Sequence, residues 1–257
     1  MDPQPLSNPT TNARVLELVT EGGLRDRRLL DLGAGNGYLA RLLADHARDE
    51  GLDPGQVLAA CDLFPDYFDC EGVECRGMRF MDSLPYDDAS FDCVYSVEVV
   101  EHLENPYAFL REIYRVLRPG GLAVVTTPNL LNLNSRLAFA GRGFWMLFGP
   151  LATDEESARY LSGHIMPMHP YYLNWGMARA GFEQVAHHHD RFKSSALAML
   201  PLAWPLIKLS EWKSRRRMAR KTPGLLADNS TALAAMNSWR TLCARSTIVA
   251  ARKVAAG

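Results

Sequence analysis

The chain of 257 residues has little of what marks several large classes of protein. Its five cysteines are odd in number and scattered without C-x-x-C spacing, which favours reduced thiols over a disulfide framework. No apolar run reaches the ~18 residues that a membrane-spanning helix needs. The opening residues Met-Asp-Pro-Gln-Pro contain neither a basic segment nor an apolar run, so we expect no secretion signal and a cytoplasmic location.

The chain also lacks an excess of positive or negative charge, and it lacks the motifs of a catalytic nucleophile. The formal net charge is −1, with 47% hydrophobic and 22% charged residues, which predicts a globular protein with a large core. This balance gives no support for a nucleic-acid partner. The sequence has no G-x-S-x-G elbow and no cysteine in a context that would activate it. We therefore expect no covalent nucleophile.

The most informative segment present is residues 29–37, Leu-Leu-Asp-Leu-Gly-Ala-Gly-Asn-Gly. Strand-type residues lead to an acidic residue, glycines follow at alternate positions, and residues 38–43 have helical spacing. A strand that enters a glycine turn and then a helix lets the backbone approach a ligand closely, with helix N–H groups aimed at it. The spacing differs from both the G-x-x-x-x-G-K-[S/T] phosphate loop and the G-x-G-x-x-G dinucleotide fingerprint.

Strand-like and helix-like segments alternate through the first half of the chain. This order predicts a parallel sheet with helices on both faces, whose ligands bind beyond the carboxyl ends of the strands. The glycine turn lies at such an end. We expect strands at 28–32, 57–61, 73–76, 93–96, 122–127, 181–186 and 246–251, and helices at 11–21, 38–48, 67–70, 99–101 and 106–117.

A second acidic residue, Asp62, closes the second expected strand, about 30 residues after Asp31. A carboxylate there is placed to accept hydrogen bonds from both ribose hydroxyls of an adenosine ligand. Leu63 and Phe64 beside it would cover an adenine face. The alternative is that Asp62 caps the next turn, and the sequence does not separate the two roles.

Further motifs follow in order: L-P-Y-D-D-A-S-F-D at 84–92, V-E-V-V-E-H-L-E-N-P at 97–106 and R-V-L-R-P-G-G at 115–121. Together with the glycine turn, they resemble the class I S-adenosylmethionine-dependent methyltransferases, of methyltransferase domain type 11 or 23. The quinone-pathway O-methyltransferases are especially similar. The resemblance covers about residues 29–129, with a weaker echo to Phe182.

The resemblance implies a Rossmann-like seven-stranded sheet whose last strand is antiparallel, and S-adenosylmethionine as the methyl donor. The usual D-x-x-x-L-P is shortened here to Asp82-Ser-Leu-Pro. Carried over position by position, the resemblance implies Asp31, Gly33 and Gly35 at the methionine moiety, Asp62 at the ribose, Leu63 at the adenine, Asp82 at the adenine amino group, and the Ser96 backbone near the donor's amino end.

The acceptor side is less defined. Glu98, Glu101 and His102 follow the fourth expected strand, and helical spacing would put all three on one face beside the donor. His102 would be the general base for a hydroxyl acceptor, because histidine exchanges its proton near neutral pH. A pocket-wall role and a metal site remain open. The metal site would add His164 or His169, because the pattern is similar to that of small-RNA 2′-O-methyltransferases.

His164 also resembles a histidine that faces the acceptor pocket in such enzymes, with a capping role as the alternative. The expected cap over residues 129–169 is apolar, with Phe-Trp-Met-Leu-Phe at 144–148, which favours an apolar acceptor over RNA. His187, His188 and His189 look like a metal cluster. Successive residues of a strand point to opposite faces, however, so we expect no metal there.

A long insertion occupies residues 194–245. Its apolar stretch 195–207, interrupted by Pro201 and Pro205, is too short to span a membrane and leads into a basic run. Apolar and tryptophan residues followed by cations are typical of a segment in an anionic membrane interface, so 195–221 is a candidate peripheral contact on the inner face of a membrane. A lid over the pocket or a dimer contact is the alternative. The basic run is Lys208, Lys213, Arg215, Arg216, Arg217, Arg220 and Lys221.

The sequence thus predicts one methyltransferase domain over residues 1–257, with a core of 24–128, 170–193 and 246–254, a cap of 129–169 and an insertion of 194–245. The expected reaction is O-methylation of an apolar, lipid-linked, quinone-like or envelope-precursor small molecule. A metal-assisted RNA 2′-O-methyltransferase and a non-catalytic, donor-binding regulatory subunit are the alternatives.

Overall fold

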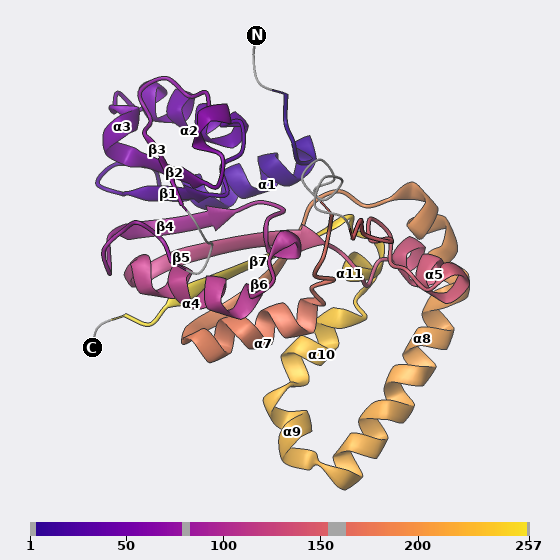
Figure 1. Ribbon diagram of the computed structural model, residues 1–257. Helices are drawn as coiled ribbons and strands as arrows, with labels where there is room; N and C mark the ends of the chain where they lie inside the picture. The colour runs from indigo at the N-terminus through magenta and orange to yellow at the C-terminus, as the bar shows by residue number, and fades with distance from the viewer. Residues whose placement is uncertain (1–3, 79–82, 154–162, 256–257) are drawn as a thin grey trace.

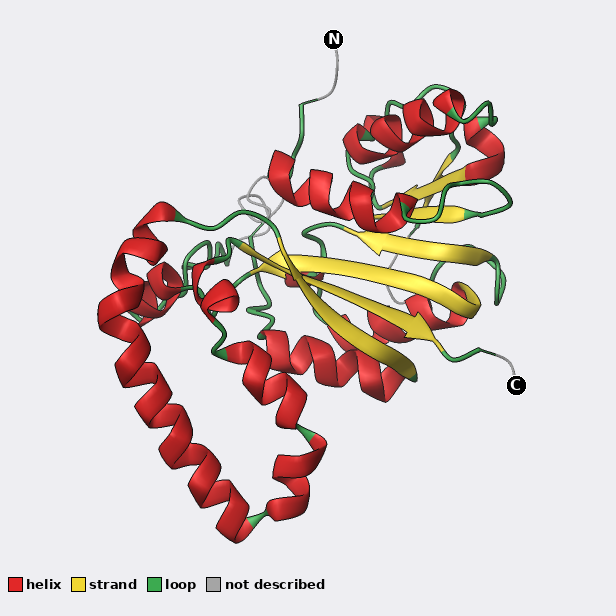
Figure 2. Cartoon of the chain, turned by 180° about the vertical axis from the view of Figure 1, so that it is seen from behind, coloured by secondary structure: helices red, strands yellow, loops and turns green. Residues whose placement is uncertain are grey.

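The computed structural model describes residues 4–78, 83–153 and 163–255. One seven-stranded sheet has the order β3-β2-β1-β4-β5-β7-β6 (Figures 1 and 2). Strands β1 to β5 are parallel, and β7 lies antiparallel between β5 and β6. This confirms the predicted sheet with its antiparallel final strand. The strands are β1 Leu29–Leu32, β2 Leu58–Asp62, β3 Cys75–Gly77, β4 Phe91–Ser96, β5 Leu117–Pro128, β6 Phe182–His189 and β7 Ser246–Lys253.

Helices cover both faces of the sheet. One apolar cluster joins the strands to α1, α2 and α3, and another joins them to α4 and α7. The helices are α1 Pro9–Thr20, α2 Tyr38–Asp49, α3 Pro54–Val57, α4 Pro106–Val116, α5 Leu133–Arg142, α7 Pro170–Ala180, α8 Ser194–Lys221, α9 Pro223–Asp228, α10 Ser230–Met236 and α11 Trp239–Cys243, with 3₁₀ turns η1 Pro65–Tyr67 and η2 Val100–His102.

Several helices begin in the same way. The side chains of Asn8, Asn105 and His169 each accept a hydrogen bond from a backbone N–H of the first turn, at the starts of α1, α4 and α7. A proline follows each of them at the first helical position, where its missing N–H costs nothing. The capping side chain and the proline together define the first residue of α1, of α4 and of α7.

The helix expected at 67–70 is wrong. A 3₁₀ turn forms earlier, at η1, and the backbone is already extended at Phe68. Proline at position 65 fixes the first φ of that turn, so the turn starts there and ends at Tyr67, where the expected helix would begin.

Helix α8 runs without interruption through Pro201 and Pro205, although proline normally breaks or kinks a helix. Because the prolines are four residues apart, they share one face of the helix, and both are exposed. The carbonyls that lose their N–H partners, those of Leu197 and Pro201, also belong to exposed residues and can be hydrated. Among the described residues, no helix is both long and apolar enough to cross a membrane.

Candidate functional site

A cleft of about 1090 Å³ opens beyond the carboxyl ends of β1, β2 and β4. This is the switch point of the sheet, where the strand order reverses between β1 and β4. We call one wall the glycine-turn side, formed by Asp31, Gly33, Gly35, Asp62 and Leu63. The opposite wall is the histidine side, formed by His102, Leu147, Leu151, His164 and Ile165.

The glycine turn requires glycine at position 33. Gly33 has φ +79, and its N–H donates to the Cys61 carbonyl at 2.8 Å, which ties the turn to the end of β2. A Cβ on Gly33 would lie 2.4 Å from Val99 Cγ2. The turn therefore lies directly against the loop that follows β4, and only a residue without a side chain leaves room for both.

Asp62 holds the turn from the side. Its Oδ2 accepts a hydrogen bond from the Gly35 N–H at 2.8 Å, and its Oδ1 accepts one from the Phe64 N–H at 2.9 Å. Asp62 thus caps the following turn, as one interpretation of the sequence has it, and it also lines the cleft. A carboxylate has lone pairs left after these two bonds, so the capping role leaves room for a ligand hydroxyl.

Asp31 is the penultimate residue of β1, and its side chain is buried at the floor of the cleft. Burial raises its pKa to about 7, a rise that the nearby Tyr95 hydroxyl partly offsets and the Asp62 charge increases. Asp31 Oδ2 has no hydrogen-bond partner within the described residues. A buried carboxyl group without a partner attracts a cationic ligand group, because pairing removes the cost of ionising it.

The other expected donor residues have mixed positions. Leu63 lines the cleft and is exposed beside Phe64. Ser96 is fully buried at the end of β4, and it is the next residues, Val97 and Glu98, that line the cleft. Asp82 lies outside the described residues.

Glu98, Glu101 and His102 do not share a helical face, so that expectation is wrong. Glu98 has a left-handed backbone, φ +54, and only the short turn η2 follows it. Its carboxylate turns toward β7 and forms an ion pair with Arg245 at 2.7 Å. A hydrogen bond from the Ser246 hydroxyl at 3.2 Å adds to it. The β4 loop is thereby fastened to the last strand.

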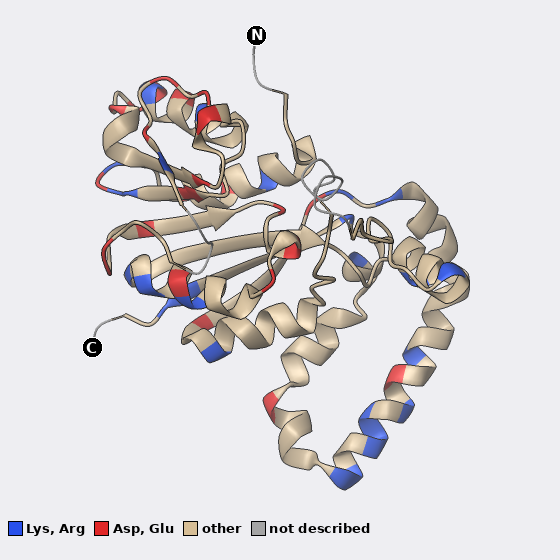
Figure 3. Ribbon diagram, in the orientation of Figure 1, with Lys and Arg blue, Asp and Glu red and all other residues tan. Residues whose placement is uncertain are grey.

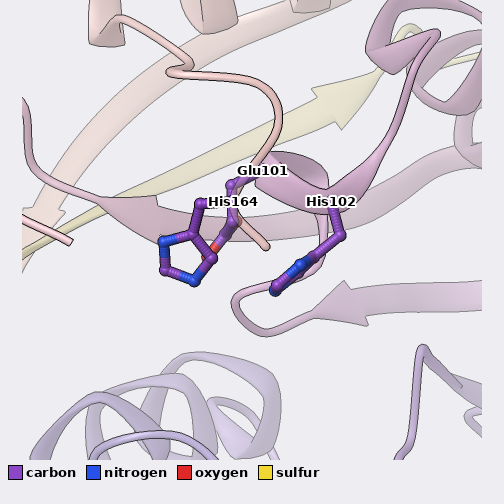
Figure 4. A group of neighbouring side chains, drawn as sticks. All are labelled: Glu101, His102 and His164. Carbon is purple, nitrogen blue, oxygen red and sulfur yellow. The ribbon is translucent and has the colours of Figure 1, made fainter. Parts of the chain in front are cut away.

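Glu101, His102 and His164 converge instead (Figure 4). Their ligand atoms lie within 4.8 Å of one another, and the two imidazole rings meet edge to face with centroids 4.8 Å apart. Glu101 is fully buried with no partner for either carboxylate oxygen in the described part of the chain, and burial raises its pKa to about 8. Burial also lowers the pKa of His164, as does the neighbouring His102.

Three of the other histidines, His169, His188 and His189, have structural partners. His169 accepts a hydrogen bond from the Tyr171 N–H and caps α7, so it is not the distant histidine of this cluster. His188 Nδ1 contacts Arg14, whereas His189 Nε2 contacts Thr241. The strand therefore separates these two histidines, as expected, and the described residues form no metal-like group around them.

Sequence reasoning missed two contributors. Leu6, Ser7 and Asn12 line the cleft from the segment that enters α1, and Arg245 fixes Glu98 from the start of β7. No motif marks either segment. The Asn-Pro pair at the start of α1 predicts a helix there, but only the fold brings it over the glycine turn.

Comparisons with known proteins bear on this site. Residues 30–125 match the family model described as a methyltransferase domain. A probable S-adenosylmethionine-dependent methyltransferase of Mycolicibacterium smegmatis is 39% identical over 109 residues, 42% of this chain and 40% of that protein. A ubiquinone biosynthesis O-methyltransferase of Maricaulis maris is 30% identical over 130 residues, 50% of this chain and 51% of that protein. The matches thus span about half of these relatives or less.

A solved structure shows the same fold over nearly the whole chain. The S-adenosylmethionine-dependent methyltransferase from Archaeoglobus fulgidus superimposes with a TM-score of 0.55. It is 18% identical, with 96% of this chain and 95% of that one covered. The family match ends near the close of β5, so the cap and the long insertion fall outside it.

Proposed function

The first half of the chain is a class I S-adenosylmethionine-dependent methyltransferase domain, and from this we propose that the protein methylates an oxygen atom of an apolar small molecule. One observation carries the proposal. A single cleft has a glycine turn with two carboxyl groups on one wall, and a histidine pair among apolar residues on the other.

On the glycine-turn side, we assign the donor's sugar to Asp62 and its adenine to Leu63. The ammonium group of the donor would pair with Asp31, whose buried carboxyl has one oxygen without a hydrogen-bond partner in the described part of the chain. Gly33 and Gly35 would let the methionine moiety approach the backbone. The Ser96 backbone and Asp82 stay predictions for the amino end and the adenine amino group.

Methyl transfer requires the protein only to align the two reactants and to accept the proton of the acceptor. The acceptor oxygen attacks the methyl carbon in line, the new C–O bond forms as the C–S bond breaks, and S-adenosylhomocysteine leaves. Aligning the two reactants supplies much of the rate, roughly 7–11 kcal/mol of the barrier in favourable cases. The acceptor's hydroxyl proton must go to a base, and His102, in the cleft wall, is our candidate. His164 would hold its ring in place, since the two rings pack edge to face.

The acceptor is proposed to be apolar because of the histidine side. Leu147, Leu151 and Ile165 line the cleft there and are exposed to solvent. Exposed apolar side chains around a cleft are typical of a site that an apolar ligand covers. The relative named as a ubiquinone biosynthesis O-methyltransferase supports a quinone-like or lipid-linked phenol.

An acceptor screen tests the proposal. Purified protein with labelled S-adenosylmethionine is incubated with quinone, lipid and sugar extracts, and products are sought by the mass shift of one methyl group. A methylated phenol or quinol is the expected result. Donor binding by calorimetry without turnover of any extract would instead support a donor-binding regulatory subunit.

The buried cluster favours a second candidate, a metal-assisted RNA 2′-O-methyltransferase. Glu101, His102 and His164 offer one carboxylate and two imidazoles, a donor set suited to a divalent ion. Loss of activity on chelation, restored by one metal, together with methylation of RNA 3′ ends, would select this function. Activity on a phenol that survives chelation would select the metal-free base.

A further inference from the structure

Helix α8 stands away from the sheet as an arm, and α9 and α10 bring the chain back (Figures 1 and 2). Of its 28 residues, only Ala196 is buried. Its base packs on α5 and α11 through a small cluster that includes Leu133 and Leu242. Because so little of this long helix is buried, packing against the core stabilises it only weakly. Its exposed outward face is therefore a candidate binding surface.

The outward face is a continuous stripe. Leu202, Leu206 and Leu209 recur every three or four residues, and Lys213, Arg216 and Arg220 continue the same spacing to the tip. Leu202 is 81% exposed, Leu206 71% and Trp212 51%. We call these residues, together with Arg217 and Lys221, the outer face of α8.

The charges on α8 are sorted by face. Its single carboxylate, Glu211, is turned inward and held by Lys208 at 2.8 Å and Arg215 at 3.0 Å. The cations of the outer face have no carboxylate partner among the residues that the structure describes, and they colour the far half of α8 in Figure 3. Arg216 stacks on the Trp212 ring, 4.5 Å from its centroid.

These side chains enclose a shallow hollow. It measures about 310 Å³ and is lined by Trp212, Lys213, Arg216, Arg217, Arg220 and Lys221 alone. A hollow walled by one indole and five cations suits a phosphate-bearing group that is attached to something apolar, because the leucines continue directly from it along the helix.

We propose that the outer face of α8 docks on an anionic lipid bilayer, with the leucines and Trp212 at the boundary of headgroups and acyl chains and the cations on lipid phosphates. An apolar stripe with tryptophan beside a cluster of cations is the composition that such an interface selects. A nucleic acid would leave Leu202 and Leu206 exposed. A second copy of the chain would set its own cations against these cations or against leucine.

The surface also bears on the reaction. Leu137 and Phe139 of α5 are exposed, α5 packs on α8, and Phe139 stacks on Trp145, two residues before Leu147 of the cleft wall. Delivery of a lipid-linked acceptor along this side rests on the proposed function. Docking itself does not, because it is measured without substrate.

Vesicle co-sedimentation of the full chain tests the docking. Vesicles of phosphatidylcholine with about 30% phosphatidylglycerol should bind the protein, and pure phosphatidylcholine should bind it far less. Arg216→Gln/Arg220→Gln should lower the partition coefficient by roughly tenfold or more, since each cation near the surface contributes. Leu202→Ser/Leu206→Ser should lower it as well.

Two exposed arginines elsewhere provide the matched control. Arg111→Gln/Arg179→Gln, on α4 and α7, removes the same charge and should leave vesicle binding unchanged. Affinity for S-adenosylhomocysteine should stay constant in every variant, which separates docking from the methyl-transfer site and reports folding. Equal binding to both vesicle types, equal losses in the control, or binding to single-stranded RNA in place of vesicles would overturn the proposal.

Discussion

The two walls of the cleft are built in different ways. The glycine-turn side comes from one run of chain, residues 31–63, and its main bonds join backbone atoms to Asp62 or to the end of β2. The histidine side joins His102 to the segment at 163–164, 61 residues away, and Glu98 to Arg245, 147 residues away. The glycine-turn side thus rests mainly on contacts between residues that are close in the sequence, whereas the histidine side depends on segments that only the completed fold brings together.

The difference between the two walls matches the different roles proposed for them. Methyltransferases that use the same methyl donor need the same donor-binding geometry. Their acceptors differ, so the acceptor-binding wall can be assembled from segments whose sequence varies. If this assignment of roles holds, substitutions on the histidine side should alter turnover alone, and substitutions on the glycine-turn side should alter donor affinity or stability.

His102→Ala should have the largest effect. Removing a general base lowers kcat by about 10²–10⁴-fold, whereas donor affinity should change less than about twofold because the ring lies on the opposite wall. Single-turnover rates with the acceptor found by screening, and calorimetry with S-adenosylhomocysteine, measure the two. His46→Ala, on the exposed face of α2, is the control. An unchanged rate would make His102 a wall residue.

Gly33→Ala tests the point where the walls touch. Gly51 has a similar φ, +73, with nothing within 4 Å of a new Cβ, so Gly51→Ala costs only the left-handed backbone, about 1–2 kcal/mol. Gly33→Ala adds the clash with Val99 and should cost about 1–3 kcal/mol more in the free energy of unfolding. Urea denaturation measures both. Equal losses would mean that Val99 yields freely and that the walls are not coupled there.

Asp62→Ala should weaken donor binding by about 1–3 kcal/mol, the range for losing hydrogen bonds to a charged group. The N–H groups of Gly35 and Phe64 also lose their partner. Asp53→Ala is matched, because Asp53 likewise accepts a bond from an N–H two residues on, at the start of α3, and does not line the cleft. Calorimetry should show normal donor affinity for Asp53→Ala. Normal affinity for Asp62→Ala would limit Asp62 to its capping role.

Whether a feature depends on neighbouring or on distant residues also determines whether it could be predicted from the sequence. Strand patterns, the glycine spacing and Asp62 are signals carried by residues close together in the sequence. All seven strands and the glycine turn could therefore be predicted, with bounds that differ by at most three residues except at β5, which begins five residues earlier than expected. The pairing of Glu98 with Arg245 could not, because nothing near either residue marks the other. Helical spacing at 98–102 misled because the backbone of Glu98 is left-handed, which periodicity does not report.

The insertion shows the same limit in another form. Two prolines in a helical pattern normally predict a break, and only the fold reveals that both lie on the exposed face of α8, where the freed carbonyls belong to exposed residues and are open to hydration. Composition alone did separate the apolar from the basic part of this segment. What it could not predict was that Glu211 turns inward and leaves the outer cations without a carboxylate partner among the residues placed in the structure.

The pH dependence of donor affinity should be the mildest effect, and it concerns Asp31. Burial holds its pKa near 7 in the free protein, so the carboxyl is largely protonated below that pH. The donor is a cation that favours the ionised form, and binding must therefore expel a proton whenever the pH is below about 7. Affinity should stay level above about pH 7 and fall as the pH drops from 7 to 6, by at most about tenfold per pH unit. Asp31→Asn should bind more weakly at pH 8 and lose this slope, and calorimetry in buffers of different ionisation enthalpy should show the released proton disappear with it. A slope retained in Asp31→Asn would assign the titration to another group, and Asp31 would then not be the partner of the donor's ammonium group.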